Sequence, residues 1–282
     1  MKRTRHITRG LLARWPLPKL DPDGGKVSRG TLLVAGGSDT VSGAVTLAGI
    51  GGLRAGAGTL QIATTRRAMP IVAGAVPEAR VLGLPTVRGE LAPAAASAIT
   101  RLAAECEAIV LGPGSQAANL ARAARGPAVW VVDAAAIPGF AKLATRPPHA
   151  VLTPHPGEMA RLCDLETAEV IERAPDLARE TAARLGCVIA LKCAVTFIAS
   201  PDGALFESTA GNHGLGTSGS GDVLSGIIGG LAARGADPLQ AAVWGVHVHG
   251  RAGDVLARRR GPLGYLAREL LEEIPAALAR IR

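Results

Sequence analysis

Short apolar runs alternate with Ala- and Leu-rich stretches along almost the whole chain, and this alternation constrains the fold more than any other feature. Several runs are apolar at every position, as parallel strands covered by helices on both faces should be. We therefore predict a single α/β domain, residues 1–282, built on an open, mainly parallel sheet flanked by helices on both faces. The expected strands are 31–36, 59–64, 108–112, 128–132, 150–154, 188–192 and 195–200. The expected helices are 43–56, 91–106, 115–125, 157–164, 168–185, 220–234, 238–259 and 263–281.

The composition excludes several classes of protein. Hydrophobic residues make up 48% of the 282 residues, enough for a sizeable core. Aromatic residues are only 2%, too few for base-stacking platforms, so we expect no nucleic acid partner. No apolar run approaches the ~20 residues of a membrane span, so we expect no membrane partner. The four cysteines form no CxxC pair and indicate thiols in a reducing compartment, which favours a cytoplasmic protein.

The positive charge is concentrated at the start of the chain. The formal net charge is +8, and residues 1–29 carry eight Lys or Arg against two Asp. The simplest interpretation is a solvated basic arm. The alternative is attraction of an anionic ligand such as a nucleotide.

A glycine- and hydroxyl-rich stretch, Gly211 to Gly226, runs straight into an apolar helix. Amides at a helix start are unpaired and carry partial positive charge, so Gly219, Ser220 and Gly221 can form a hole for phosphate oxygens or a developing anion. Asp222 in the first turn can accept a proton from a substrate hydroxyl. The alternative makes Asp222 a helix N-cap. The stretch also contains G-x-G-x-x-G, but no buried strand precedes it, so it is not a dinucleotide fingerprint.

Other motifs follow predicted strands, where ligands bind in open α/β sheets. The run LTPHPGE holds His155 between two prolines, and Glu158 either binds a ligand or stabilises the next helix. In the run LGPGS, Gly112 and Gly114 have no side chain, so the backbone there can lie flat against a ligand. The alternative is a tight turn, which needs the same residues. The run KCAVT, residues 192–196, offers a ligand the amine of Lys192 and the hydroxyl of Thr196. The alternative is a plain hairpin between two strands.

Two weaker signals involve carboxylate and imidazole groups. Asp133 ends a strand, where it can order water or Mg²⁺. His247 and His249 are two residues apart on an expected helix, which is poor geometry for one metal, so we interpret both as packing residues.

Taken in order, these motifs resemble those of the ADP/ATP-dependent NAD(P)H-hydrate dehydratases of the ribokinase-like superfamily. The match runs from about Leu17 to about Asp254 and comprises RGTLLVAGGS, GA followed by LRAGAG, LGPGS, VVDAAAI, LTPHPGE, LKCAVT and NHGLGTSGSGDVLSG. The resemblance implies a ribokinase-like fold without a separate lid domain. It also implies repair of the S epimer of hydrated NADH or NADPH, with ADP or ATP as phosphoryl donor and Mg²⁺ as cofactor.

The resemblance implies roles for individual residues. The hydrated nicotinamide nucleotide would contact Ala44, Gly114, His155 and Asp222, with Asp222 as the catalytic base. The adenine nucleotide would be held by Lys192, Cys193, Ala194, Val195, Thr196 and Gly221. Metal ligands stay unassigned. As partners, we expect further copies of the chain, with a tetramer as one form, and a separate epimerase, because the motifs begin too early to leave room for a fused one.

Two departures from the family pattern concern the site. The second carboxylate of the usual DADAL is missing at Ala135, and the glycine of the usual KGxxT is Cys193. Neither departure changes the position of Asp222 in the motif. Two other functions stay open: a vitamin-alcohol or sugar kinase of the same superfamily, and a nucleotide-sensing or nucleic-acid-binding protein without catalysis.

Overall fold

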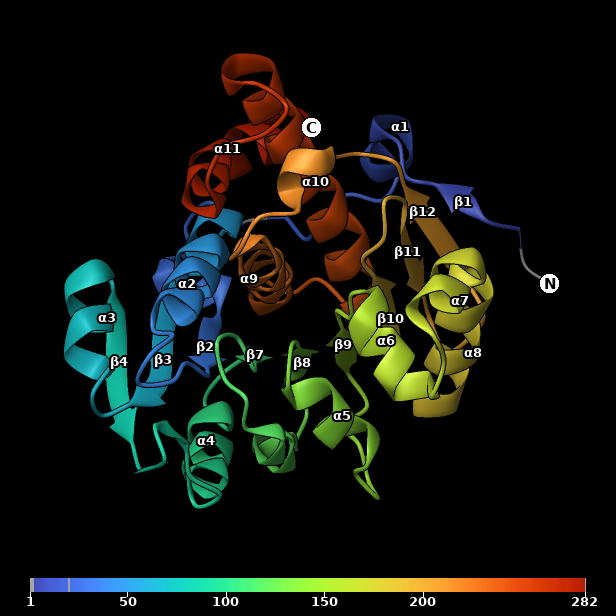
Figure 1. Cartoon of the computed structure of the whole chain (residues 1–282). Coiled ribbons are helices and arrows are strands. Elements are labelled where there is room, and N and C mark those ends of the chain that lie inside the picture. Colours follow the sequence, from blue (N-terminus) through green and yellow to red (C-terminus); the bar gives the residue numbers. More distant parts are fainter. Residues whose placement is uncertain (1–2, 20, 282) are drawn as a thin grey trace.

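The computed structural model describes residues 3–19 and 21–281 (Figure 1). Within these residues ten strands form one sheet in the order β1-β12-β11-β10-β9-β8-β7-β2-β3-β4. All neighbouring pairs from β10 to β4 are parallel, and β11 runs antiparallel to β10 and β12. The strands are β1 (Arg5–His6), β2 (Thr31–Ala35), β3 (Thr59–Thr65), β4 (Ala79–Leu84), β7 (Ala108–Leu111), β8 (Val129–Val132), β9 (Ala150–Leu152), β10 (Val188–Leu191), β11 (Thr196–Ala199) and β12 (Leu205–Ser208).

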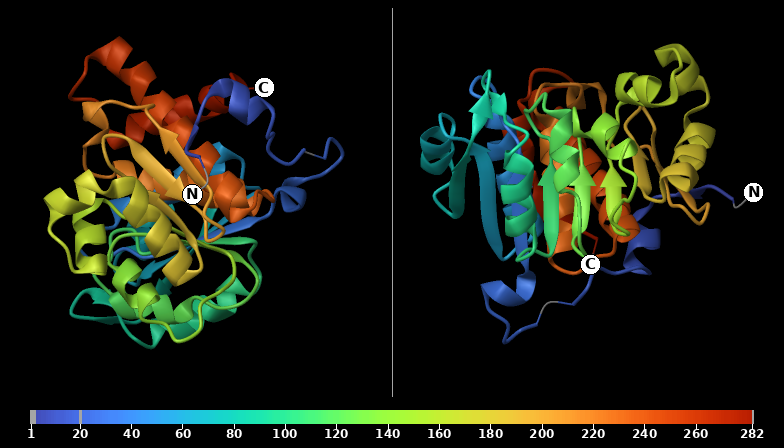
Figure 2. Two further views of the ribbon diagram at one scale, coloured as in Figure 1. Left: turned by 90° about the vertical axis from the view of Figure 1, so that its right-hand side faces the viewer. Right: turned by 90° about the horizontal axis from the view of Figure 1, so that it is seen from below.

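Helices cover both faces of the sheet (Figure 1, Figure 2). One apolar core joins the sheet to α2 (Gly43–Ala55), α3 (Met69–Ala75), α9 (Ser220–Ala233), α10 (Pro238–Arg260) and α11 (Ala267–Ala279). The core of the other face includes α4 (Ala95–Ala103), α5 (Ala136–Ala141), α6 (Pro156–Cys163), α7 (Thr167–Glu172) and α8 (Ala174–Leu185). The predicted class, an open and mainly parallel α/β sheet between helices, is confirmed. In the part of the chain that the structure describes, no helix is long and apolar enough to cross a bilayer.

The remaining elements are short. They are α1 (Arg9–Ala13), the hairpin of β5 (Thr86–Val87) and β6 (Glu90–Leu91), and the 3₁₀ turns η1 (Lys26–Arg29), η2 (Ala118–Ala123) and η3 (His213–Leu215). The expected helix 115–125 is thus only the 3₁₀ turn η2. The expected helix 168–185 is split into α7 and α8, because Pro175 in the first turn of α8 has no N–H to continue a helix from α7.

Two glycines of α9 lie directly against the backbone of α2. A Cβ atom at Gly226 would lie 2.1 Å from the Ala48 carbonyl oxygen, and one at Gly230 would lie 2.3 Å from that of Gly52. Neither position accepts a side chain, because two helix backbones meet there. We call these four residues the glycine seam. The glycine seam fixes where α9 lies above the sheet and therefore where its first turn lies.

The basic N-terminal segment is packed against the domain, so its interpretation as a solvated arm is wrong for residues 5–18. β1 pairs with β12, and Leu12 is fully buried. Trp15 stacks on Phe206 with ring centroids 5.8 Å apart, and its carbonyl accepts a hydrogen bond from Trp244 Nε1 at 3.0 Å. The sequence misleads here because its apolar stretches, such as Leu11 to Ala13, are short and interrupted by charged residues and prolines.

Candidate active site

Three polar side chains meet where the adjacent strands β8, β9 and β10 end. Asp133 follows β8, Thr153 follows β9 and Lys192 follows β10. Asp133 Oδ1 accepts hydrogen bonds from Thr153 Oγ1 at 2.8 Å and from Lys192 Nζ at 3.1 Å. Asp133 and Thr153 are buried, so the ion pair is poorly screened by water and holds the Lys192 amine in place. The sequence marks Asp133 and Lys192 as strand-end side chains, but it does not reveal this contact.

The glycine-rich loop ends beside this ion pair. Gly219, with φ +89°, is the N-cap of α9, and Ser220 is the first residue of the helix. A Cβ atom at Gly221 would lie 3.4 Å from Lys192 Nζ and 4.0 Å from Asp133 Oδ2. The predicted anion hole and the predicted nucleotide-binding residues Lys192 and Gly221 are therefore brought together. The start of α9 and the ammonium group make one positively charged corner.

Asp222 lies in the first turn of α9, as predicted, but it is not the N-cap. The alternative interpretation as a capping residue is therefore wrong. The pKa of Asp222 is raised to about 7, foremost because burial disfavours the charged carboxylate and next because the Asp133 charge repels it; Lys192 opposes both effects. A carboxyl group with a pKa near 7 is suited to exchange a proton at neutral pH.

His249 contacts the anion hole from α10, and sequence reasoning misses this contact. The imidazole is buried, and its Nε2 lies 3.0 Å from Ser220 Oγ. Burial lowers the pKa of His249 to about 4, so the ring is neutral at pH 7. The interpretation of His249 as packing alone is incomplete. No local motif could have linked it to Ser220, which lies 29 residues away in the chain.

His155 begins helix α6. Its Nδ1 accepts a hydrogen bond from the Gly157 amide at 3.0 Å, while Glu158 Oε2 accepts one from the His155 amide at 2.8 Å. Because Nδ1 is an acceptor, the proton of the neutral ring lies on Nε2. Lys192 N donates to Pro154 O at 2.9 Å, so this turn adjoins the Lys192 corner. The helix-stabilising role considered for Glu158 is present. The exposed His155 ring also faces this carboxylate, with Nε2 3.6 Å from Glu158 Oε1.

Ala44 and Gly114 lie against each other, although 70 residues separate them. Gly114 has φ +66°, and a Cβ atom there would lie 2.7 Å from Ala44 Cβ. The loops that carry them are joined by a hydrogen bond of 2.7 Å from Gly37 N to Pro113 O. Both predicted substrate-side residues therefore lie just beyond the ends of β2 and β7.

Residues 192–195 form the turn between the antiparallel strands β10 and β11, and Thr196 opens β11. The hairpin considered from the sequence is thus present, and it presents Lys192 to Asp133. Cys193 and Val195 are half-buried, whereas Ala194 is exposed. Burial raises the pKa of the Cys193 thiol to about 11, so it is protonated at pH 7.

A preformed metal centre is not present within residues 3–19 and 21–281, because no three His, Cys, Asp or Glu side chains there are grouped to hold an ion. Mg²⁺ usually binds proteins through one or two carboxylates plus the phosphates of a nucleotide. Asp133 and Asp222 interact electrostatically beside the anion hole and supply such a pair. This donor set fits Mg²⁺ that arrives with a nucleotide.

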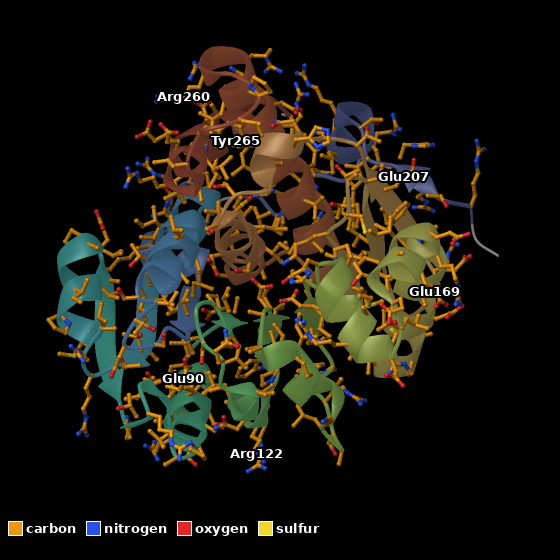
Figure 3. The ribbon with its side chains drawn as sticks, in the orientation of Figure 1. Glu90, Arg122, Glu169, Glu207, Arg260 and Tyr265 are labelled. Carbon is orange, nitrogen blue, oxygen red and sulfur yellow. The ribbon has the colours of Figure 1, made fainter. Side chains whose placement is uncertain are left out.

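Cavities of about 1080, 470 and 490 Å³ lie elsewhere and are lined by residues near the chain termini, β12 and α10. We place the candidate active site at the strand ends, where the amides of Gly219 and Gly221, a buried ion pair and a perturbed carboxyl group coincide. The Ser220 amide, also predicted for the anion hole, instead donates to Thr217 O at 3.2 Å. Tyr265, labelled in Figure 3, lies on the connection between α10 and α11. Its hydroxyl donates to Asn212 Oδ1 at 2.9 Å and so anchors the loop of this site.

Known proteins are similar to this chain in sequence and in fold. A family model described as NAD(P)H-hydrate dehydratase matches residues 32–276. An ADP-dependent (S)-NAD(P)H-hydrate dehydratase from Xanthomonas campestris pv. campestris is 46% identical, over 99% of this chain and 98% of that protein. The ADP/ATP-dependent NAD(P)H-hydrate dehydratase from Bacillus subtilis, co-crystallised with ATP and Mg²⁺, has a TM-score of 0.84 at 30% identity, with both chains fully covered.

A ribokinase-like superfamily protein from Enterococcus faecalis has the same fold, with a TM-score of 0.84 over 99% of this chain and 96% of that chain. At 24% identity it bears on the fold alone. The predicted ribokinase-like fold is therefore confirmed. The family model and the 46% identity over the full length lead to one conclusion: the chain belongs to the NAD(P)H-hydrate dehydratase family.

Proposed function

We propose that this chain is a lyase that restores NADH and NADPH from their S-epimer hydrates, with ADP or ATP as phosphoryl donor. One observation carries the proposal: the start of α9 lies beside Lys192, with Asp222 in its first turn. Transfer of a phosphoryl group to a hydroxyl needs a positively charged hole for the phosphate and a base for the proton. The family relatives supply the identity of the substrate.

The proposed reaction has two steps. Asp222 takes the proton of the ring hydroxyl. The hydroxyl oxygen bonds to the terminal phosphorus of the nucleotide, while the P–O bond between that phosphorus and the departing AMP or ADP breaks. Lys192 and the amides of Gly219 and Gly221 stabilise the charge on the transferring group. Phosphate then leaves with the C–O bonding electrons, expelled by the lone pair of the ring nitrogen. Loss of a proton from the adjacent ring carbon restores the dihydronicotinamide.

Two sets of residues would divide the ligands. Ala44, Gly114 and His155 lie on the side that we assign to the hydrated nicotinamide nucleotide. The adenine nucleotide is assigned to Gly221 and to the turn of residues 192–196. Cys193, which is half-buried, carries a side chain where the family usually has a glycine, so the nucleotide would have less room to approach the backbone there. Mg²⁺ would bind the nucleotide phosphates with Asp133 or Asp222 and neutralise their charge.

We also propose that residues 1–282 act as one catalytic domain, in a cytoplasmic homo-oligomer such as a tetramer. The domain proposal is supported by the pairing of β1 with β12, which joins the N-terminal segment to the sheet that carries the site. Because the chemistry is assigned to one epimer of the hydrate, a separate epimerase would supply it from the other.

The second candidate is a small-molecule kinase of the same superfamily, because the anion hole and Asp222 serve it equally well. To separate the two, the protein is incubated with hydrated NADH, Mg²⁺ and either ADP or ATP, and NADH absorbance is followed. We expect nucleotide-dependent recovery of NADH. Phosphorylation of a vitamin alcohol without recovery of NADH would support the kinase instead.

A further inference from the structure

A cavity of about 470 Å³ lies between the N-terminal segment, α10 and the C-terminal end of α11. Figure 1 shows α1 and the chain's C-terminus beside α10, and Leu12, Trp244 and Ile281 line a neighbouring cavity. The cavity of about 470 Å³ has a volume within the range of small-molecule pockets. None of its lining residues belongs to the candidate active site. We call it the terminal cavity.

The terminal cavity has a surplus of positive charge. Its wall includes Arg9, Arg251 and Arg280 and a single carboxylate, Asp254. That carboxylate is already used: Oδ2 accepts from Arg251 at 3.0 Å, and Oδ1 accepts from the Gly211 amide at 3.2 Å. The guanidinium groups of Arg9 and Arg280 pair with no other described residue. Two positive charges therefore remain at one cavity.

His247 adds hydrogen-bonding capacity that the fold does not use. The side chain is 8% exposed and lies in the cavity wall, and its buried Nδ1 has no hydrogen-bond partner among the described residues. Burial, assisted by Arg251 and opposed by Asp254, lowers the pKa of His247 to about 4, so the ring is neutral at pH 7. Buried polar atoms without a partner are uncommon and point to a missing ligand or water.

We propose that the terminal cavity binds a small organic phosphate monoester. Guanidinium groups match phosphate oxygens with paired N–H donors, and a monoester carries nearly two negative charges at pH 7. The aliphatic side chains of Ile7, Val255 and Ile281 line the remainder and suit a short organic group. Arg9 and Arg280 come from opposite ends of the chain, so a bound phosphate would also tie the two termini together.

The test uses the full chain with glycerol 3-phosphate as the probe and ring signals of labelled histidine as the readout. We expect a saturable change at His247 and a pKa of this ring above about 4, because the phosphate stabilises the imidazolium form. Inorganic phosphate should bind several-fold more weakly, since it leaves the aliphatic wall uncovered. Equal affinity for both probes would overturn the assignment of an organic ligand.

Arg9→Gln and Arg280→Gln should each weaken glycerol 3-phosphate binding about tenfold, as expected for the loss of one charge-assisted hydrogen bond. Both side chains are exposed, so the variants should fold. Arg258→Gln is the matched control, because Arg258 is exposed on α10 but outside the cavity. The proposal fails if all four proteins bind equally, or if the probe perturbs His155 and His213 but not His247. Because no turnover is measured, these outcomes are independent of the dehydratase proposal.

Discussion

Asp222 is the residue on which the chemistry depends most. Gly219 is the N-cap of α9, so replacement of Asp222 by Asn removes a base without removing a cap. We expect Asp222→Asn to lower kcat by roughly 10²–10⁴, the usual contribution of a positioned general base. Since the folded pKa of about 7 lies above the ordinary 3.8, ionisation of Asp222 opposes folding increasingly from about pH 4 to pH 7. The variant should therefore melt no lower than the parent at pH 7, which calorimetry would check alongside kcat.

A near-normal kcat for Asp222→Asn would remove this residue from the mechanism. The Asp222→Ala variant is the control, because it also removes the side chain's hydrogen-bonding capacity. Similar melting temperatures for both variants would agree with the absence of a capping role.

Asp133 should control the pH dependence through Asp222. The base works only when it is deprotonated, so kcat/KM should rise with pH through about 7. Asp133→Asn removes a negative charge that raises the pKa of Asp222. It also frees the Lys192 ammonium group, whose charge lowers the pKa of Asp222, from its ion pair. Both changes move the midpoint of the kcat/KM profile to lower pH. A pH profile of kcat/KM for the variant tests this, and an unmoved or higher midpoint would contradict it.

At the residue scale, the sequence predicts the side chains that follow strands or open a helix, because parallel strand ends share one edge of the sheet. The structure places Asp222, Lys192, Gly221 and Gly114 at such positions, and their roles as site residues stay a prediction. The contact of His249 with Ser220 is not predicted, because it depends on how α10 packs against α9.

At the scale of elements, α10 supports the first turn of α9 through His249. Replacement of His249 by Leu leaves the buried Ser220 hydroxyl without its partner, which should cost about 1–3 kcal/mol of unfolding free energy. It should also lower kcat, because the hydroxyl at the anion hole is no longer held. His249→Gln, which can replace the hydrogen bond, should recover part of both losses. Chemical denaturation and kcat for the two variants check this; equal kcat in parent and His249→Leu would leave His249 a purely structural role.

Helix α6 offers a way to separate the two roles of His155. Asn is a good N-cap, so His155→Asn should keep the helix start, whereas His155→Ala should lose about 0.5–2 kcal/mol of stability. Both variants should bind the hydrated dinucleotide more weakly, with a smaller effect on ADP, because Nε2 is assigned to the substrate side. Calorimetric titration with each ligand measures the difference. Equal weakening for both ligands would point to a disturbed turn rather than a lost contact.

Elements with a continuous apolar pattern are predictable here, and the edges of the sheet are not. The seven expected strands are all present, because each carries a run of buried side chains. β1, β4 and β12 escape prediction. β1 has only two residues, β4 is mostly half-buried without a run of buried side chains, and β12 includes the polar residues Glu207 and Ser208. Pro175 marks the break between α7 and α8, and this signal is present in the sequence.

At the scale of the whole molecule, the N-terminal segment contributes to stability and not to the site. Deletion of residues 1–10 removes Ile7 from the core, removes β1 and removes the Thr8 cap of α1. Burial of one such aliphatic side chain contributes about 1.5–3 kcal/mol, so the melting temperature should fall. The kcat of the folded fraction should stay close to that of the parent, because the strand ends that carry the site are untouched. Turnover and thermal melts of the truncated protein, at a temperature where it remains folded, test both statements; a large loss of kcat there would contradict the second.

The pairing of β1 with β12 has a consequence for biosynthesis. Arg5 and Phe206 are register partners about 200 residues apart, and the wall against which α1 packs includes α10. During translation, the segment that carries β1 must wait until β12 has been made before it can dock. Contacts of such long sequence separation form late, so this cationic segment stays undocked while the intervening residues are synthesised.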